Sequence, residues 1–257
     1  MEIIFLGTGT SEGVPGIIND NPILDLSNSK NWRTRSSIHV VINNFHIQVD
    51  AAQEFRLQCI ANHVTQVDLF ILTHGHADHI LGMDDLRRFS IDHPLTVYSS
   101  PDGLERIKAV FPYAITPERK SKFYPSFNLN LMPSTLPIPG GLIHSTPLPH
   151  GNVQTLGLIF EESASKKRVA YFPDCKSIPP EATALAQKAD LLIIDAIRET
   201  DPHPTHMTFP EALEAAGKIN ASQTILTHTT SSVDYATSQS KLPPNTLIAY
   251  DGLHMHL

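Results

Sequence analysis

The chain has 257 residues, 41% of them hydrophobic, and a formal net charge of −7 at pH 7. This length and apolar content suffice for one large domain with a continuous core, and no boundary is evident, so we expect a single domain over residues 1–257. The negative charge and the lack of a Lys/Arg-rich arm argue against nucleic acid as a partner. No apolar run approaches the roughly 20 residues that cross a bilayer, so we expect no membrane partner.

Short apolar segments alternate with amphipathic ones along the chain. The first predicted strand, Met1–Leu6, runs into the Gly-rich turn Gly7–Pro15. The clearest helix is Phe209–Ile219, with Thr208 as N-cap and Glu211 at the spacing of a capping box. Two sheets packed face to face with helices outside would bury this many strands. The remaining predicted strands are Ile38–Ile42, His46–Val49, Asp68–Leu72, Leu95–Tyr98, Gly157–Phe160, Arg168–Phe172, Leu191–Ile194, Thr224–Leu226 and Leu247–Tyr250.

Two further features bear on organisation and compartment. The stretch Met132–Gly141 has the Pro, Ser and Gly content of a linker, but candidate ligands fall on both sides of it, so we expect it to join two halves of one fold. The first strand carries no basic leader or cleavage site, and only two cysteines, Cys59 and Cys175, are present. We therefore expect a cytoplasmic protein and assign neither thiol any chemistry.

The run Thr73–His79 directly follows the apolar stretch Leu69–Leu72 and packs four potential metal ligands into six positions. Imidazole and carboxylate groups suit zinc and similar first-row ions. Three more candidates each follow an apolar run or turn, and strand ends converge along one edge of a sheet. The alternative, polar residues scattered on a solvated turn, fits so dense a run poorly. The candidate ligands are His74, His76, Asp78, His79, His150, Asp174 and His228.

These residues resemble the metallo-β-lactamase superfamily, whose His-x-His-x-Asp-His motif is followed by a His, a bridging Asp and a final His. The resemblance implies an αββα sandwich of two mixed sheets flanked by helices. It also implies two metal sites, one held by His74, His76 and His150 and the other by Asp78, His79 and His228, with Asp174 binding both ions.

Two divalent ions, zinc or manganese, explain hydrolysis without a protein nucleophile. They lower the pKa of bound water to about 7, so that hydroxide is available near neutral pH, and they stabilise developing negative charge. The Ser and Thr residues of the Gly-rich turn, including the Gly-x-Ser-x-Gly pattern at Gly9–Gly13, need not be catalytic. The same ligand set serves β-lactams, thioesters, lactones and phosphodiesters, so other segments must indicate the substrate.

Four segments resemble the phosphodiesterase branch of the superfamily, which includes the PhnP-like cyclic-phosphate phosphodiesterases and, more distantly, the tRNA 3′-processing endonucleases. The resemblance makes His206, rather than His203, the general acid that protonates the leaving group, and it counts the ligand Asp78 among the catalytic residues. The expected substrate is a small phosphodiester or cyclic nucleotide. The four segments are Gly7–Pro15, Asp84–Arg87, Asp201–Thr208 and Ala249–Leu253.

Several residues have a weaker claim on the site. Asp50 matches a family position that orients a metal-bound His or water, with a turn residue as the alternative. Among the arginines, Arg87 has the best position to clamp a phosphate. The backbone amides of the Gly-rich turn either approach an anion or simply form a turn. His254 and His256 alternate onto one strand face and receive no assignment.

Alternative functions stay open at this stage. They are a tRNA 3′-processing-type endonuclease, a thioesterase or lactonase on the same metals, and a non-hydrolytic metal-binding pathway protein. Some relatives carry a cysteine cluster for a separate zinc after the Gly-Val-Pro turn, but Gly16–Asp20 contains no cysteine, which leaves that zinc and the pathway open. A homodimer is compatible with the sequence.

Overall fold

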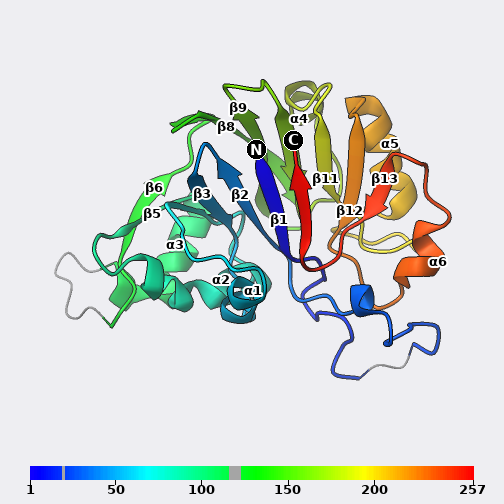
Figure 1. Cartoon of the computed structure of the whole chain (residues 1–257), viewed down its shortest axis with the longest axis horizontal. Coiled ribbons are helices and arrows are strands. Elements are labelled where there is room, and N and C mark those ends of the chain that lie inside the picture. The colour runs from blue at the N-terminus through cyan, green and yellow to red at the C-terminus, as the bar shows by residue number, and fades with distance from the viewer. Residues whose placement is uncertain (19–20, 116–122) are drawn as a thin grey trace.

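Two seven-stranded sheets face each other in the computed structural model, which describes residues 1–18, 21–115 and 123–257 (Figure 1). Asn19 and Asp20, the last two residues of the cysteine-free segment, lie outside the described residues. The first sheet has the order β14 (Leu253–His256), β1 (Glu2–Gly7), β2 (Ser37–Ile42), β3 (Phe45–Val49), β4 (Leu69–Ile71), β5 (Leu95–Ser99), β6 (Phe127–Leu131). The second has the order β13 (Thr246–Ile248), β12 (Gln223–Thr227), β11 (Leu191–Asp195), β10 (Arg168–Phe172), β9 (Val153–Glu162), β8 (Gly141–His150), β7 (Thr135–Ile138).

Helices cover the outer face of each sheet, which completes the predicted αββα sandwich (Figure 1). On the first sheet lie α1 (Phe55–Ala61), α2 (Ala77–Ile80), α3 (Pro101–Val110) and the 3-10 segment η2 (Leu81–Phe89). On the second lie α4 (Pro180–Leu185), α5 (Phe209–Ile219) and α6 (Tyr235–Gln239). Two short 3-10 turns, η1 (Ser29–Asn31) and η3 (Pro112–Ala114), complete the elements. Both sheets are mixed, so the expected fold class is confirmed.

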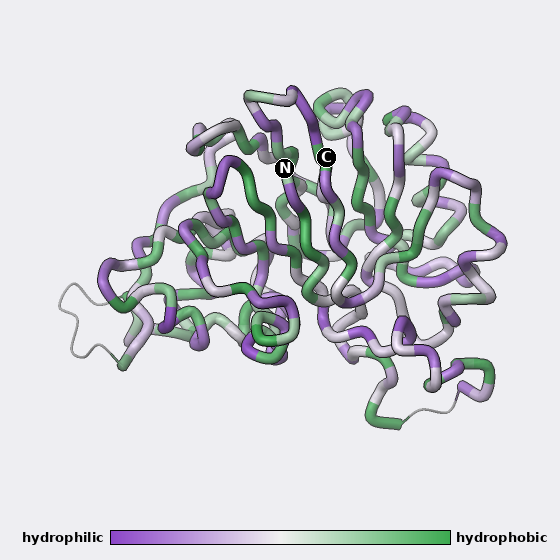
Figure 2. Tube along the Cα trace, viewed as in Figure 1, coloured by the Kyte–Doolittle hydropathy of each residue, from purple (hydrophilic) through white to green (hydrophobic). Residues whose placement is uncertain are grey.

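Strand patterning explains why the sheets pack in this way. In β2, Ile38, Val40 and Ile42 point into the core between the sheets. In β11 every residue is buried, because Leu191 and Ile193 face the other sheet while Leu192 and Ile194 pack beneath the helices. Parallel strands covered on both faces read as continuous apolar runs, and Figure 2 shows hydrophobic stretches along the strands at the centre of the molecule.

The predicted helix α5 forms with the capping box that its sequence indicates. The backbone N–H of Thr208 donates to Oε2 of Glu211 over 2.7 Å, so a donor at the start of the helix is satisfied. Pro210 lies in the first turn, where its missing N–H costs nothing. The helix ends at Asn220, which adopts the left-handed conformation common at this position.

The sequence analysis did not predict strands β6, β7 and β8, and of β14 it expected only that His254 and His256 alternate onto one strand face. The linker-like stretch Met132–Gly141 contains β7, which pairs with β8 at the edge of the second sheet, while β6 lies at the edge of the first. An edge strand tolerates Pro137 because one side of it needs no N–H donor. The stretch therefore joins the two sheets, as expected, but does so as part of the second sheet.

The sheet topology places many loops at one edge of the sandwich. Strands β3 and β4 run parallel in the first sheet, and β10, β11 and β12 run parallel in the second. Their carboxyl ends therefore lie at the same end of the structure, where the loops carry the candidate ligands. Within the described part of the chain, no helix has both the length and the apolar character needed to cross a membrane.

Candidate active site

Strand ends position every proposed ligand. The run Thr73–His76 leaves β4 in extended conformation, and His76 is the N-cap of α2, so Asp78 and His79 lie on the first turn of that helix. His150 is the last residue of β8. Asp174 follows β10 and His228 follows β12. His228 adopts a left-handed backbone (φ 61°), which costs a non-glycine residue about 1–2 kcal/mol and requires neighbouring contacts to hold it.

The first ligand group is made of three imidazoles whose nitrogens converge. Nδ1 of His76 lies 2.9 Å from Nε2 of His74 and 3.3 Å from Nε2 of His150. The side chains of His74 and His150 are buried, whereas His76 is more open to solvent. Three neutral imidazoles that direct lone pairs at one point form a donor set suited to zinc or a similar ion.

The second group contains Asp78, His79, Asp174 and His228, all buried. Oδ2 of Asp174 lies 3.3 Å from Nε2 of both His79 and His228. The same oxygen is 3.9 Å from Nε2 of His74 and of His150 in the first group. Asp174 therefore stands between the two groups, the position expected of a ligand shared by two ions.

The chemistry of this cluster fits divalent cations. Nε2 of His79, Nε2 of His228 and Oδ1 of Asp174 are buried without a hydrogen-bond partner among the described residues, which is costly unless something else satisfies them. Although burial opposes a charged ring, Asp174 and the other carboxylates raise the pKa of His79 well above its usual value and that of His228 to about 9. The site thus attracts positive charge, and two cations bound by these residues would supply it.

Asp50 lies behind the second group. Its Oδ2 accepts from Nδ1 of His79 over 2.7 Å, and its two oxygens also accept from the backbone N–H and hydroxyl of Thr73. Burial raises the pKa of Asp50, against the opposing effect of His79 and Thr73. The contact fixes the proton of His79 on Nδ1 and leaves Nε2 free to bind a metal. This is the place that the resemblance gives to Asp50.

His206 lies beside the ligands and is paired with a carboxylate that sequence reasoning missed. Nδ1 of His206 donates to Oδ2 of Asp195 over 2.8 Å, and its ring stacks on that of His228 at 4.8 Å between centroids. His203 instead contacts the backbone and hydroxyl of Thr205. Asp195 is the last residue of a parallel strand and Asp50 directly follows another, β3, and this position at a strand end is the signal that could have revealed Asp195.

A cleft of about 340 Å³ opens above these groups. Its walls come from both halves of the fold: Ser11 from the Gly-rich turn, the hairpin residues Gly151, Asn152 and Val153, and Thr205 beside the proposed acid. The other residues that line it are His76, Asp78, His150, Asp174, His206 and His228. The structure therefore brings all seven predicted ligands and His206 to one place, although Ser11 and the hairpin were not foreseen as its walls.

The Gly-rich turn packs backbone against backbone. A Cβ on Gly9 would lie 2.7 Å from the carbonyl oxygen of Arg33, and one on Gly7 would lie 2.0 Å from that of Arg35. The turn needs glycine for these close approaches. Two of its backbone amides, the N–H groups of Thr8 and Gly9, donate to the carbonyl oxygen of Thr34.

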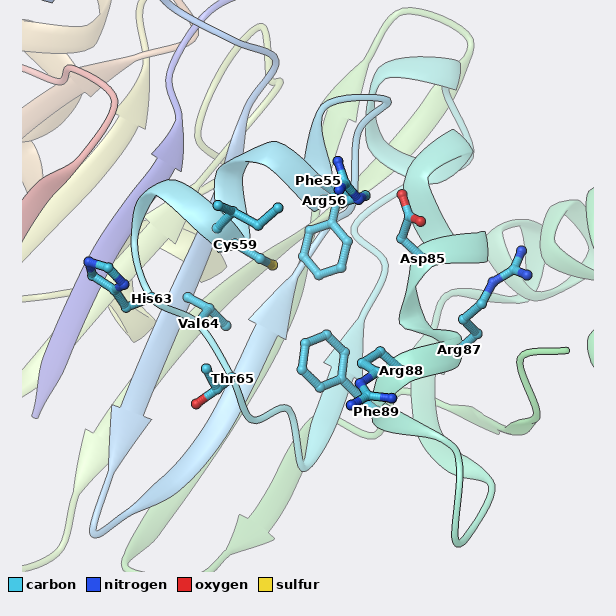
Figure 3. Close-up of a pocket in the computed structure, with 11 residues that line it drawn as sticks. Phe55, Arg56, Cys59, His63, Val64, Thr65, Asp85, Arg87, Arg88 and Phe89 are labelled. Atoms are coloured by element: carbon cyan, nitrogen blue, oxygen red, sulfur yellow. The ribbon is translucent and has the colours of Figure 1, made fainter. Parts of the chain in front are cut away.

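Arg87 is not brought to the cleft. Its guanidinium pairs with Asp84 and donates to the carbonyl of Phe123, and it lies on the wall of a different cavity of about 690 Å³ between α1 and η2. Figure 3 shows its side chain directed away from Phe55 and Phe89 in that cavity. The expectation that Arg87 reaches the site through its closeness in sequence to the ligand run is therefore not met, because η2 turns the side chain outward.

Arg33, Arg35, His254 and His256 are not among the residues that line the cleft. Arg33 is buried and donates to the carbonyls of Thr230 and Val233. Arg35 pairs with Glu54. His254 lies 3.2 Å from Glu2 on the exposed face of the first sheet, and His256 lies nearby on the same face, away from the cleft. Both cysteines are buried and free.

Comparison with known proteins places the chain in a family. The family model for the beta-lactamase superfamily domain matches residues 43–229, well over half of the chain. A crystal structure of a new diphosphatase from the PhnP family aligns with a TM-score of 0.88 and 29% identity over 100% of this chain and 97% of that one, which confirms the expected likeness to the PhnP branch. Zinc-bound PqqB from Methylobacterium extorquens has the same fold, with a TM-score of 0.82 and 20% identity over the full length of both chains.

A curated relative is the octanoyltransferase of Porphyromonas gingivalis (strain ATCC BAA-308 / W83), 29% identical over 259 residues. The match includes 98% of this chain but 51% of that protein, so the chain spans about half the length of this relative. The matched fold, together with the buried His/Asp cluster of a metal-dependent hydrolase, leads to one conclusion: the chain belongs to the metallo-β-lactamase superfamily.

Proposed function

We propose that this protein is a dinuclear metal-dependent phosphodiesterase that acts on small phosphodiesters, cyclic ones included. The observation that carries the proposal is the hydrogen-bonded pair Asp195–His206, held at 2.8 Å beside the two ligand groups. Metal ligands alone serve many hydrolytic reactions. An oriented proton donor at the same cleft favours a reaction whose leaving group needs a proton.

The proposed roles follow from the positions of the side chains. His74, His76 and His150 would hold one divalent ion, Asp78, His79 and His228 the other, and Asp174 both. When bound, two such ions, zinc or manganese, activate water and neutralise charge on the non-bridging phosphoryl oxygens. Asp195 fixes a proton on Nδ1 of His206, so Nε2 is the nitrogen left to protonate a departing alkoxide.

A small substrate fits the cleft and the charge of the protein. The cleft holds about 340 Å³, the size of a site for a small molecule. A net charge of −7 gives no general attraction for a long polyanion such as tRNA. The similarity to a PhnP-family diphosphatase at 29% identity supports a phosphoryl group as the reacting centre.

The name of the longer relative points to a second candidate, hydrolysis of an acyl thioester. That relative is an octanoyltransferase of which the match includes only half, so its name need not describe this domain. A thiolate leaves readily without a proton, whereas an alkoxide does not. The Asp195–His206 pair therefore favours the phosphodiester.

The test compares leaving groups. Metal-stripped protein is reconstituted with zinc or manganese and assayed on bis(4-nitrophenyl) phosphate, on a ribose 2′,3′-cyclic phosphate and on an octanoyl thioester. We expect metal-dependent cleavage of both phosphodiesters. On the cyclic phosphate, whose leaving group is an alkoxide, His206→Ala should lower kcat about 10²–10⁴-fold. On bis(4-nitrophenyl) phosphate, whose leaving group is stable without a proton, the fall in kcat should be much smaller.

His203→Ala is the matched control, since it removes a neighbouring imidazole whose Nδ1 contacts Thr205 instead of Asp195. It should retain activity close to that of the wild type. Efficient thioester hydrolysis that is indifferent to His206→Ala, with no phosphodiester cleavage at full metal loading, would overturn the proposal in favour of the acyl substrate.

A further inference from the structure

Asp251 makes three short hydrogen bonds in the turn between β13 and β14. Its Oδ1 accepts from the hydroxyl of Thr8 over 2.8 Å. Its Oδ2 accepts from the backbone N–H of Thr34 over 2.7 Å and from the Thr34 hydroxyl over 2.6 Å. The carboxylate of Asp251, near the carboxyl end of the sequence, thus connects the turn after β1 to the segment before β2 by hydrogen bonds.

Thr8 also contacts the backbone next to a proposed metal ligand, His228. The carbonyl of Thr8 accepts from the backbone N–H of Thr229 over 3.1 Å, and Thr229 directly follows His228. On the other side, the carbonyl of Thr227 accepts from the N–H of Ala196. The left-handed backbone of His228 is therefore held between two backbone contacts, one of which depends on where Thr8 lies.

The same turn forms a wall of the cleft. Ser11 lies three residues after Thr8 and lines the cleft, and its carbonyl accepts from Nε of Arg35 over 2.8 Å. A movement of Thr8 would therefore displace the backbone beside His228 and the wall at Ser11 together.

A carboxylate at this position has an energetic cost. Burial raises the pKa of Asp251 to about 6, while Thr34, Thr8 and the guanidinium of Arg33 favour the charged form. The side chain touches no proposed ligand, so that cost is not explained by direct metal binding. What it does touch is the turn that supports His228.

We propose that Asp251 is a positioning residue for the metal group of Asp78, His79, Asp174 and His228, acting through Thr8 and Thr229. The inference rests on the proposed metal centre but not on the nature of the substrate. It assigns the segment Ala249–Leu253, with no contact to the ligands, a function in metal binding.

The test measures metal affinity by calorimetric titration of zinc into stripped protein. We expect the wild type to bind two ions. Asp251→Asn keeps the shape of the side chain but cannot accept all three hydrogen bonds, so one of the two ions should bind about 10-fold more weakly while the affinity for the other changes less than about 2-fold. Thr8→Val should reproduce this loss, and Thr8→Ser, which retains the hydroxyl, should restore the wild-type affinity.

The matched control is Asp190→Asn. Asp190 also accepts a backbone N–H, that of Arg168 over 2.8 Å, and a lysine ammonium, but it lies at the opposite end of β11 from the cleft. Its variant should bind both ions normally. In the double variant Thr8→Val with Asp251→Asn, the loss should not exceed that of the larger single variant, because both act through one contact.

The inference is overturned if Asp251→Asn and Thr8→Val both bind two ions with wild-type affinity, or if Asp190→Asn weakens zinc binding to the same extent. The Thr8 variants decide the matter even if Asp251→Asn fails to fold. A wild type that binds fewer than two ions overturns the metal centre and this inference with it. A wild type that binds two ions but cleaves no phosphodiester overturns only the proposed function.

Discussion

Asp195 contacts His206 with one carboxylate oxygen, at 2.8 Å from Nδ1, and directs the other toward Nδ1 of His228, at 3.8 Å. One carboxylate thus stands behind both the proposed general acid and a proposed metal ligand. The backbone N–H of Cys175, the residue after Asp174, donates over 2.8 Å to Oδ2 of Asp195, the oxygen that also contacts His206. Asp195 therefore links the proposed acid to the ligand group that contains Asp174 and His228.

The first prediction concerns this pair. Asp195→Asn removes the charge that orients the His206 ring, so we expect kcat on an alkoxide-leaving phosphodiester to fall about 10²–10⁴-fold with a smaller change in KM. The double variant Asp195→Asn with His206→Ala should be no slower than the slower single variant, because the two residues act as a unit. Steady-state kinetics at full metal loading measure this. Fully additive losses would show that Asp195 acts separately from His206.

The second prediction concerns Asp50. Asp50→Asn keeps the size of the side chain but loses either the acceptor of the Thr73 backbone N–H or the oxygen that accepts from both the Thr73 hydroxyl and Nδ1 of His79. We expect zinc affinity at the second ligand group to fall about 10- to 100-fold. Competition with a chromophoric chelator measures it, with Asp190→Asn as the control. Unchanged affinity in Asp50→Asn would mean that His79 is held by the fold alone.

The third prediction is a pH dependence that originates at His39. This side chain is buried on the outer face of the first sheet, where Gln48, His46, Glu2 and Asp68 face it, and burial lowers its pKa to about 4. In the unfolded chain the imidazole of His39 has the ordinary pKa of about 6.5. Between pH 6.5 and pH 4, unfolding therefore binds a proton at His39, so the free energy of unfolding falls as the pH falls.

From pH 7 to pH 5 this single group should cost about 2 kcal/mol of unfolding free energy. Urea denaturation at both pH values measures this. The fall in unfolding free energy from pH 7 to pH 5 should be smaller by that amount in His39→Gln than in the wild type. His254→Gln, which changes an exposed histidine of the same sheet, should follow the wild type. Equal losses in wild type and His39→Gln would show that His39 is protonated in the folded protein.

The fourth prediction compares two glycines. A Cβ on Gly82 would lie 1.8 Å from the carbonyl oxygen of Ala52, where η2 crosses the loop before α1. Gly82→Ala should therefore lower the free energy of unfolding by about 1–3 kcal/mol or more. A Cβ on Gly217 in α5 would meet nothing within 4 Å. Gly217→Ala should therefore gain about 0.5–1 kcal/mol of unfolding free energy from helix propensity alone. Urea denaturation tests both, and stabilisation by Gly82→Ala would contradict the packing seen at Ala52.

The sequence by itself determined the features that depend on neighbours in the chain. The run Thr73–His79 places four candidate ligands, three His and one Asp, within six consecutive residues, and Thr208 with Glu211 marks the start of α5. Buried strands such as β11 show in the sequence because both of their faces are apolar. Strands β7 and β8 were not predicted, because edge positions and solvated faces admit proline and polar residues that resemble loops.

The tertiary structure decided which polar side chains meet. Asp195 and His206 are eleven residues apart, Thr8 and Asp251 are at opposite ends of the sequence, and nothing in the spacing of either pair indicates the contact. Arg87 shows the converse, since it follows the ligand run closely yet lies on another cavity. Local spacing determines only the position of a side chain within its own turn. The packing of the two sheets determines where that turn points and which residues the side chain contacts.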